Sequence, residues 1–357
     1  MSLIRISSPH VQRPTKTADI MRLVIIATIP GLVAMTFFFG WGTFINVVLA
    51  SIFALILEAA CIKIRKRNVA FFIKDNSALL TAILLGLSLP PFAPWWVTLT
   101  AVFVAIVIAK QLYGGLGQNP FNPAMVGYAL VLISFPVEMT RWTAPMDYSA
   151  NQWDILSFSD SVNIIFSSWN DLVQANPEID AYAGATPLDT LKHRNGLTVE
   201  ETWQNSPVLS NVGAWYAVSL CYFVGGIFLI YRKIFTWHAP MSLLATLAVI
   251  STVFFAIDPD SYADPLIHLT TGATMLGAFF IATDPVSSAT SNRGKIIFAA
   301  GIALLIYVIR TWGNYPDAMA FSVMLMNLCA PFIDQYTQPR SYGHKHAKKG
   351  QPSKDTH

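Results

Sequence analysis

Thr186 is the residue of this sequence best placed to do chemistry. It ends a Gly-Ala-Thr motif and precedes Pro187, and Asp189 follows three positions later. A hydroxyl at the N-cap, proline at the first helical position and a carboxylate in the first turn predict a helix over 188–195, ended by Gly196. Because a helix N-terminus presents free N–H groups and a positive dipole end, a phosphate group on this hydroxyl would also be stabilised. The motif is therefore a helix cap, a phosphate attachment site, or both.

The residues around this threonine match a known flavin-attachment motif. Asp180, Gly184, Ala185 and Thr186 fit the pattern Asp-x-x-[Ser/Thr]-Gly-Ala-Thr, and Ala183 departs from it. The pattern resembles the flavin-attachment sequence of the Rnf and sodium-pumping NADH:quinone reductase complexes, in which the last threonine carries FMN through a phosphoester bond. The departure leaves the attachment hydroxyl in place.

The resemblance covers nearly the whole chain. It includes Asn-Pro-Phe-Asn-Pro-Ala-Met at 119–125 and Gly-Ala-Phe-Phe-Ile-Ala-Thr-Asp-Pro at 277–285. The sequence is most similar to the RnfD family, which supplies the D-type component of the Rnf electron-transport complex. It is similar, less closely, to the B-type component of the quinone reductase, which usually carries a longer N-terminal extension.

The resemblance implies a flavoprotein that works inside a larger complex. FMN would be bound covalently at Thr186, with Asp180, Gly184 and Ala185 completing the motif, and the quinone-reductase relative implies a noncovalent riboflavin without a position. The partners would be subunits of the Rnf A, B, C, E and G type and a flavin transferase that takes FMN from FAD. Electrons would pass between reduced ferredoxin and NAD while sodium ions or protons cross the membrane. Nicotinamide chemistry belongs to another subunit, so we expect no catalytic residue, metal ligand or complete active site in this chain.

A second Gly-Ala-Thr motif ends at Thr274 and is a competing attachment site. It has His268 where the motif requires aspartate, and the residues after it, Met-Leu-Gly-Ala at 275–278, are typical of a membrane segment. A flavin transferase that works in water would not reach it easily. We therefore expect the flavin on Thr186.

The composition is that of a polytopic membrane protein. Hydrophobic residues make up 54% of the chain, charged residues 12%, and the mean hydropathy is +0.49, which excludes a soluble globular protein. A helix needs about 20 residues to span a bilayer core, and this length predicts an all-α fold of about ten transmembrane helices. The expected segments are 22–40, 43–64, 77–90, 95–110, 121–136, 213–231, 239–257, 268–283, 295–311 and 318–335.

Charge asymmetry between loops predicts the orientation in the membrane, which the resemblance implies is a bacterial inner membrane. Basic loops such as 63–67 and 232–233, and Lys110, alternate with neutral or acidic loops such as 258–260, so the positive-inside rule places both termini in the cytoplasm. This topology explains the formal charge of +3, and membrane lipid, without nucleic acid, is the expected surrounding. The predicted regions are a cytoplasmic leader (1–20), a first membrane half (21–136), an outer, periplasmic loop that carries the flavin site (137–212), a second membrane half (213–335) and a basic cytoplasmic tail (336–357).

The two membrane halves look like copies of each other. Residues 77–90 align with 272–285, each reaching proline after 13 steps, and 122–125 aligns with 316–319 at almost the same offset. Because each half contains five crossings, an odd number, the second copy enters from the opposite side, which is the inverted-repeat plan of transporter folds. The third and eighth segments are short and rich in small residues, which indicates either close helix packing or a central site.

Glu58 is a carboxylate well inside an apolar segment. A buried acid in a membrane is by default a functional hypothesis, but Glu58 lies close to the basic inner end, so snorkelling or pairing with Lys63 is favoured over ion binding. Other polar residues at the inner ends of the repeated segments could cap helices or form an ion vestibule, and capping is the simpler role. These are Asp75, Asn76, Asn119, Asn122 and Asp284.

Two functions remain open on the sequence alone. One is the flavoprotein subunit of a redox-driven ion pump. The other is a transporter or channel of related inverted-repeat fold, without flavin, in which the outer loop is only structural. The sequence contains no Rossmann glycine fingerprint, P-loop or Cys-x-x-Cys cluster. The Asp-x-x-x-Gly-Ala-Thr motif favours the first function, because a channel has no need of it.

Overall fold

The fold is predominantly helical in the part of the chain that the computed structural model describes: residues 16–143, 145, 157–167, 183–194, 196–210, 212–315 and 318–338. The strands among them, β1 (Trp142–Thr143) and β2 (Ala183–Gly184), have two residues each. The prediction of an all-α polytopic membrane protein is confirmed. Asp180 lies outside the described residues.

The first membrane half has helices at almost the predicted positions. The Asn122 side chain accepts hydrogen bonds from the N–H groups of Ala124 and Met125, and Pro123 occupies the first helical position, which fixes where the fifth segment begins. The elements are α1 (Thr17–Phe39), α2 (Gly42–Ile64), α3 (Val69–Ile73), α4 (Ser77–Ser88), α5 (Trp95–Phe103), its continuation as the π-helix η1 (Val104–Gln111), α6 (Pro123–Ser134) and α7 (Pro136–Thr140).

The second half follows the same order, with its third crossing broken. The break lies at Gly272, whose φ of +64° favours glycine. Irregular backbone at membrane depth is tolerated where protein surrounds it, and residues 278–282 are at most 4% exposed. The elements are α13 (Gly213–Tyr231), α14 (His238–Ile257), α15 (Pro265–Thr270), α16 (Thr274–Leu276), the π-helix η3 (Gly277–Ile281), α17 (Asn292–Trp312) and α18 (Met319–Tyr336).

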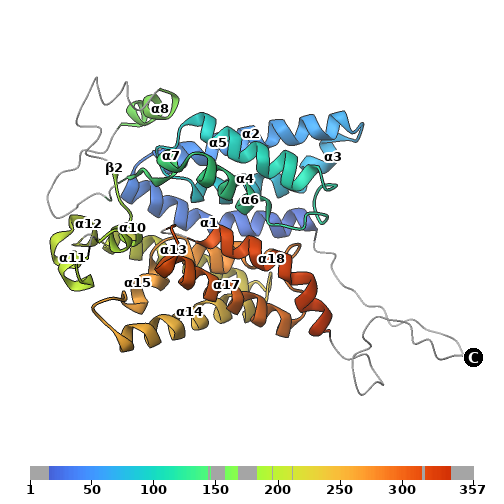
Figure 1. Cartoon of the computed structure of the whole chain (residues 1–357). Helices are drawn as coiled ribbons and strands as arrows, with labels where there is room; N and C mark the ends of the chain where they lie inside the picture. The colour runs from blue at the N-terminus through green and yellow to red at the C-terminus, as the bar shows by residue number, and fades with distance from the viewer. Residues whose placement is uncertain are drawn as a thin grey trace, which may run out of the picture.

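Short elements cover one end of the bundle, and α1 begins and α18 ends at the opposite end (Figure 1). The short elements at the covered end are β1, β2, α8 (Phe158–Phe166), α10 (Pro187–Lys192), α11 (Val199–Asn205) and α12 (Pro207–Ser210). The helix predicted over 188–195 is shorter than expected. It ends at Lys192, because the residues that follow bind the loop after α14. Arg194 donates a hydrogen bond to the carbonyl of Ser261, and the N–H of Val199 donates to the carbonyl of Asp260.

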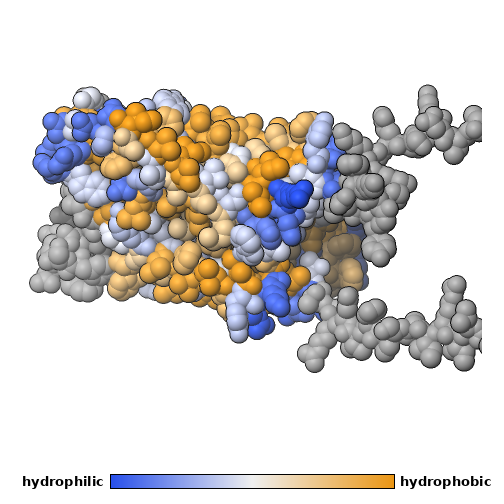
Figure 2. Space-filling model, turned by 90° about the horizontal axis from the view of Figure 1, so that it is seen from below, coloured by the Kyte–Doolittle hydropathy of each residue, from blue (hydrophilic) through white to orange (hydrophobic). Residues whose placement is uncertain are grey.

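The outside of the bundle suits a lipid environment. By length and composition, five of the described helices can cross a membrane, namely α1, α2, α13, α14 and α17. Large apolar side chains in the middle of these helices, such as Val33, Ile56 and Val249, are 60% exposed or more, as expected of a surface that faces lipid. Figure 2 shows apolar side chains across much of one face, with hydrophilic residues gathered toward the ends.

The two halves lie side by side and meet through equivalent helices (Figure 1). α1 packs along α13, and α6 packs against α18. The approach of α1 to α13 requires glycine, because a Cβ on Gly225 would overlap the carbonyl oxygen of Ala27, and one on Gly31 would overlap the ring of Tyr222. The first crossing thus meets the sixth, and the fifth meets the tenth, an arrangement that an inverted repeat allows. The repeat itself stays a prediction.

Candidate functional site

Thr186 caps α10 as the sequence predicts. Its φ and ψ are −74° and 158°, and its Oγ1 accepts a hydrogen bond from the N–H of Asp189 at 3.2 Å. Pro187 and Leu188 are buried, whereas Thr186 is half-buried. Among the described residues no acceptor takes the proton of this hydroxyl. Within this part of the chain the hydroxyl therefore uses only its acceptor capacity.

Thr186 lines a cavity of about 310 Å³ at the covered end of the bundle, which we call the outer cavity. Leu188, Asp189 and His193 line it from the same side. Aromatic and thioether side chains form much of the remaining wall, including Met35, Met125, Tyr128, Met139, Trp142, Trp215, Tyr222 and Tyr315. A mostly apolar cavity with a few polar groups at one edge is typical of a cofactor site, and a flat ring system would find aromatic faces to stack on.

Three attachments hold α10 beside this cavity. β2, which leads into the helix, pairs with β1, and Trp142 of β1 lies against Trp215 of α13, with ring centroids 5.7 Å apart. Leu188 and Leu191 bury the underside of the helix, with exposures of 7% and 8%. At the other end of α10, Lys192 donates hydrogen bonds to carbonyl oxygens at the end of α17 and in the turn that follows it. Thr186 thus lies on a short helix that is fixed at both ends.

The competing motif borders the same cavity but does not offer its hydroxyl. Gly272 and Ala273 line the outer cavity, whereas Thr274 is 0% exposed. Oγ1 of Thr274 donates to the carbonyl of His268 at 2.9 Å and accepts from Nη2 of Arg310 at 2.9 Å. Both hydrogen-bonding capacities of this hydroxyl are used inside the protein, which supports the choice of Thr186. The meeting of both motifs at one cavity was not predicted, because no local signal reports it.

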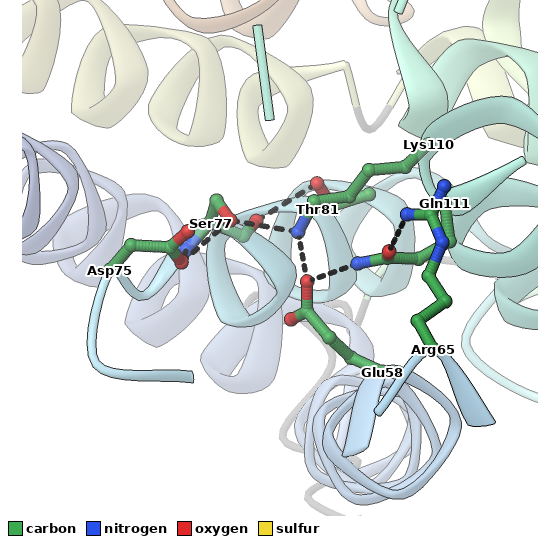
Figure 3. Close-up of polar contacts among 7 residues, drawn as sticks. All are labelled: Glu58, Arg65, Asp75, Ser77, Thr81, Lys110 and Gln111. Atoms are coloured by element: carbon green, nitrogen blue, oxygen red, sulfur yellow. Dashed lines mark hydrogen bonds and ion pairs between the residues drawn. The ribbon is translucent and has the colours of Figure 1, made fainter. Parts of the chain in front are cut away.

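A buried ion pair links α2 to η1 in the first half (Figure 3). Nζ of Lys110 is 2.6 Å from Oε1 of Glu58, and the two side chains are 2% and 3% exposed. Lys110 also donates to the hydroxyl of Ser77 at 2.7 Å, and Nε2 of Gln111 donates to the same carboxylate oxygen at 2.9 Å. Oε2 of Glu58 has no hydrogen-bond partner among the described residues.

The predicted pairing of Glu58 with Lys63 is therefore wrong, and so is the placement of Lys110 in an inner loop. Lys63 is exposed, and Lys110 lies on η1, in the last turn of the fourth crossing. A π-helix places more residues in each turn than an α-helix does, so it rotates the side chains that follow. Sequence reasoning missed one signal for this pair. Lys110 ends one apolar run, and the Glu58 carboxylate lies in another apolar run.

An inner cavity of about 760 Å³ lies at the end of the bundle near the start of α1. Ser77 and Lys110 line it, together with Asn119, Asn122 and Asp284. The capping role expected of these polar residues is confirmed for Asn122 on α6. Asp284 accepts hydrogen bonds from its own turn, from the hydroxyl of Ser287 at 2.7 Å and the N–H of Val286 at 3.3 Å. The ion vestibule stays a prediction.

The segment around η3 forms a wall of both cavities. Leu276 and Ile281 line the outer cavity, and Phe279 and Phe280 line the inner one. The broken eighth segment thus separates two spaces that approach from opposite ends of the bundle.

Comparison with known proteins decides the family. The profile of the NQR2, RnfD, RnfE family matches residues 4–343. This chain belongs to that family. A protein from Ectopseudomonas mendocina (strain ymp), named as the D-type component of an ion-translocating oxidoreductase complex, is 52% identical over 353 residues, which cover 98% of each chain.

Two further relatives carry the same name. The protein from Cellvibrio japonicus (strain Ueda107) is 48% identical over 359 residues, covering 99% of this chain and 98% of the relative. The protein from Escherichia coli O1:K1 is 49% identical over 348 residues, covering 95% of this chain and 98% of the relative. The resemblance to the RnfD family is confirmed.

Proposed function

We infer that this chain is a membrane subunit of an ion-translocating oxidoreductase complex, and that it carries FMN bound covalently to Thr186. Membership of the complex rests on the family and on the shared name of relatives that match over nearly their full length. It makes the chain part of a system that couples electron transport to ion translocation. The flavin rests on one observation, the hydroxyl of Thr186 at the edge of an apolar, aromatic cavity.

The residues around the outer cavity fit a flavin. Thr186 would hold its phosphate end, and Trp142, Trp215 and Tyr128 would contact the ring system and exclude water. His193 is the basic side chain among the described residues that line this cavity, and its Nδ1 lies 3.1 Å from Oδ1 of Asp189. When bound, FMN supplies a redox centre, and the surrounding protein groups set its position and electrostatics.

The remaining expectations form part of the same proposal. The covered end that carries α10 faces the periplasm, because the exposed basic residues Lys63, Arg65 and Lys66 lie at the other end of α2. Electrons pass between ferredoxin and NAD on other subunits, of the A, B, C, E and G type, and a flavin transferase attaches FMN. The noncovalent riboflavin stays a prediction.

The test is in-gel flavin fluorescence of the denatured chain from purified complex, because only a covalent flavin survives denaturation. Thr186→Val keeps the shape of the side chain and removes the oxygen, so we expect the fluorescent band to disappear. Thr274→Val is the matched control and should keep the band, since the Thr274 hydroxyl is occupied within the protein. Asp180→Ala should weaken the band by disturbing recognition of the motif.

Two results would contradict the proposal in different ways. A band that persists in Thr186→Val and vanishes in Thr274→Val would place the flavin on the other motif. A parent protein without any band would leave Thr186 as a helix cap only, worth about 1 kcal/mol of local stability, and would favour the transporter or channel function.

A further inference from the structure

Lys192 is the charged residue that joins α10 to the membrane core. Its Nζ lies 2.8 Å from the carbonyl oxygen of Tyr315, 3.2 Å from that of Ile309 and 3.3 Å from that of Arg310. An ammonium group has three N–H donors and no acceptor, so these three carbonyl groups satisfy it completely. Burial lowers the pKa of Lys192, and the nearby Asp189 opposes this shift. The contact is therefore a specific, partly desolvated one.

The carbonyl groups that Lys192 contacts belong to the C-terminal end of α17 and the turn that follows it. The last carbonyl groups of a helix lack partners within the helix and carry the negative end of its dipole, so a cation is stabilised there. This end of α17 is itself fixed, because Nη1 of Arg310 donates to the carbonyl of His268 in α15 at 2.8 Å. Lys192 thus docks the last residue of α10 onto a rigid part of the second membrane half.

Thr186 depends on such an anchor because α10 is short and has three buried residues, Pro187, Leu188 and Leu191. The helix has six residues, and the strand that leads into it has two. Any rotation of α10 about that strand would move Thr186 relative to Trp142 and Trp215 across the outer cavity. Lys192 opposes this rotation from the far end of the helix.

We propose that Lys192 is a positioning residue for the flavin: by docking on the end of α17 it holds α10, and with it the group attached to Thr186, against the wall of the outer cavity. This role rests on the proposed covalent FMN. Lys192 does not line the cavity, so it acts through the helix and not by touching the flavin. Its loss should leave attachment intact while loosening the flavin and slowing electron transfer through it.

The experiment uses the whole complex, purified with the parent chain, Lys192→Met, Lys192→Arg or Arg194→Gln. Lys192→Met keeps most of the stem and removes the charge. Lys192→Arg restores a cation with N–H donors. Arg194→Gln is the neighbouring control, because Arg194 donates to the carbonyl of Ser261, in the loop after α14.

Three quantities are measured for each complex: covalent flavin per chain, fluorescence anisotropy of that flavin in the native complex, and turnover. The Thr186→Val complex supplies the background from other flavins. We expect Lys192→Met to keep the parent amount of covalent flavin, to lower its anisotropy and to slow turnover on the order of tenfold, as displaced reacting groups do. Lys192→Arg should recover most of both losses, and Arg194→Gln should match the parent.

The failures are distinguishable. A parent chain without covalent flavin rejects the flavin and this role together. Covalent flavin with unchanged anisotropy and turnover in Lys192→Met rejects the role of Lys192 alone, and so does loss of the covalent flavin itself, which would make Lys192 part of attachment. If Lys192→Met does not assemble, Lys192→Gln carries the same test, and parent anisotropy and turnover in that variant would reject the role.

Discussion

Lys110 and Glu58 form an ion pair of 2.6 Å between residues 52 positions apart, with both side chains almost fully buried. Arg310 occupies a comparable place in the second half. Lys110 lies in the last turn of the fourth crossing, and Arg310 lies in the last turn of the ninth. Each donates a hydrogen bond to a hydroxyl in the first turn of a short helix. Lys110 donates to Ser77 of α4, and Arg310 donates to Thr274 of α16. Each half thus has its own buried cation at the end of the corresponding crossing, which supports the inverted repeat.

Breaking the Glu58 pair from one side should be costly. Glu58→Gln leaves the Lys110 charge buried without its counter-ion, and loss of one partner of a buried pair typically costs about 3–5 kcal/mol. We expect a lower melting temperature for Glu58→Gln and for Lys110→Met, and partial recovery in the double variant, which buries no charge. Full ion transport in a recovered double variant would exclude ion binding by Glu58, and loss of transport alone would support it.

The seam between α1 and α13 should not accept a side chain at Gly225. Gly225→Ala places a Cβ on the Ala27 carbonyl, and such overpacking typically costs about 1–3 kcal/mol. The control is Gly213→Ala on the same helix, where nothing lies within 4 Å of the added Cβ. Thermal unfolding of the purified complex should separate the two variants, and equal stability would show that the helices do not meet at this point.

The orientation predicts which residues an impermeant thiol reagent reaches from outside the cell. In a chain whose Cys61, Cys221 and Cys329 are replaced by serine, Glu200→Cys on α11 should react and Arg67→Cys should not. Both positions are exposed, so burial does not decide the result. Labelling of position 67 alone would reverse the topology and move the flavin site to the cytoplasmic side.

Membership of the family predicts that the chain is isolated with other membrane subunits, because its relatives are named as components of a complex. Affinity purification in mild detergent should recover a multi-subunit complex, and subunit composition by mass spectrometry measures it. Recovery of the chain alone, active in ion transport after reconstitution into vesicles, would contradict the oxidoreductase function and favour a channel.

Hydrophobic length and turn signals predicted the positions of the main helices well because these signals are local. Residues 77–90 became α4 and the turn that ends at Pro90, and Thr186 caps α10 as its neighbours required. What the sequence could not supply was non-local. The partner of Glu58 depends on the π-helical geometry of η1, and the anchor of α10 depends on a lysine meeting the end of α17, more than a hundred residues away.

The wall at η3 has a consequence for any ion pathway through this chain. Leu276 and Ile281 line the outer cavity, whereas Phe279 and Phe280 line the inner one. These side chains come from one short segment of the chain, and residues 278–282 are at most 4% exposed. An ion that passed from one cavity to the other would therefore have to displace the tightly packed side chains of this one segment.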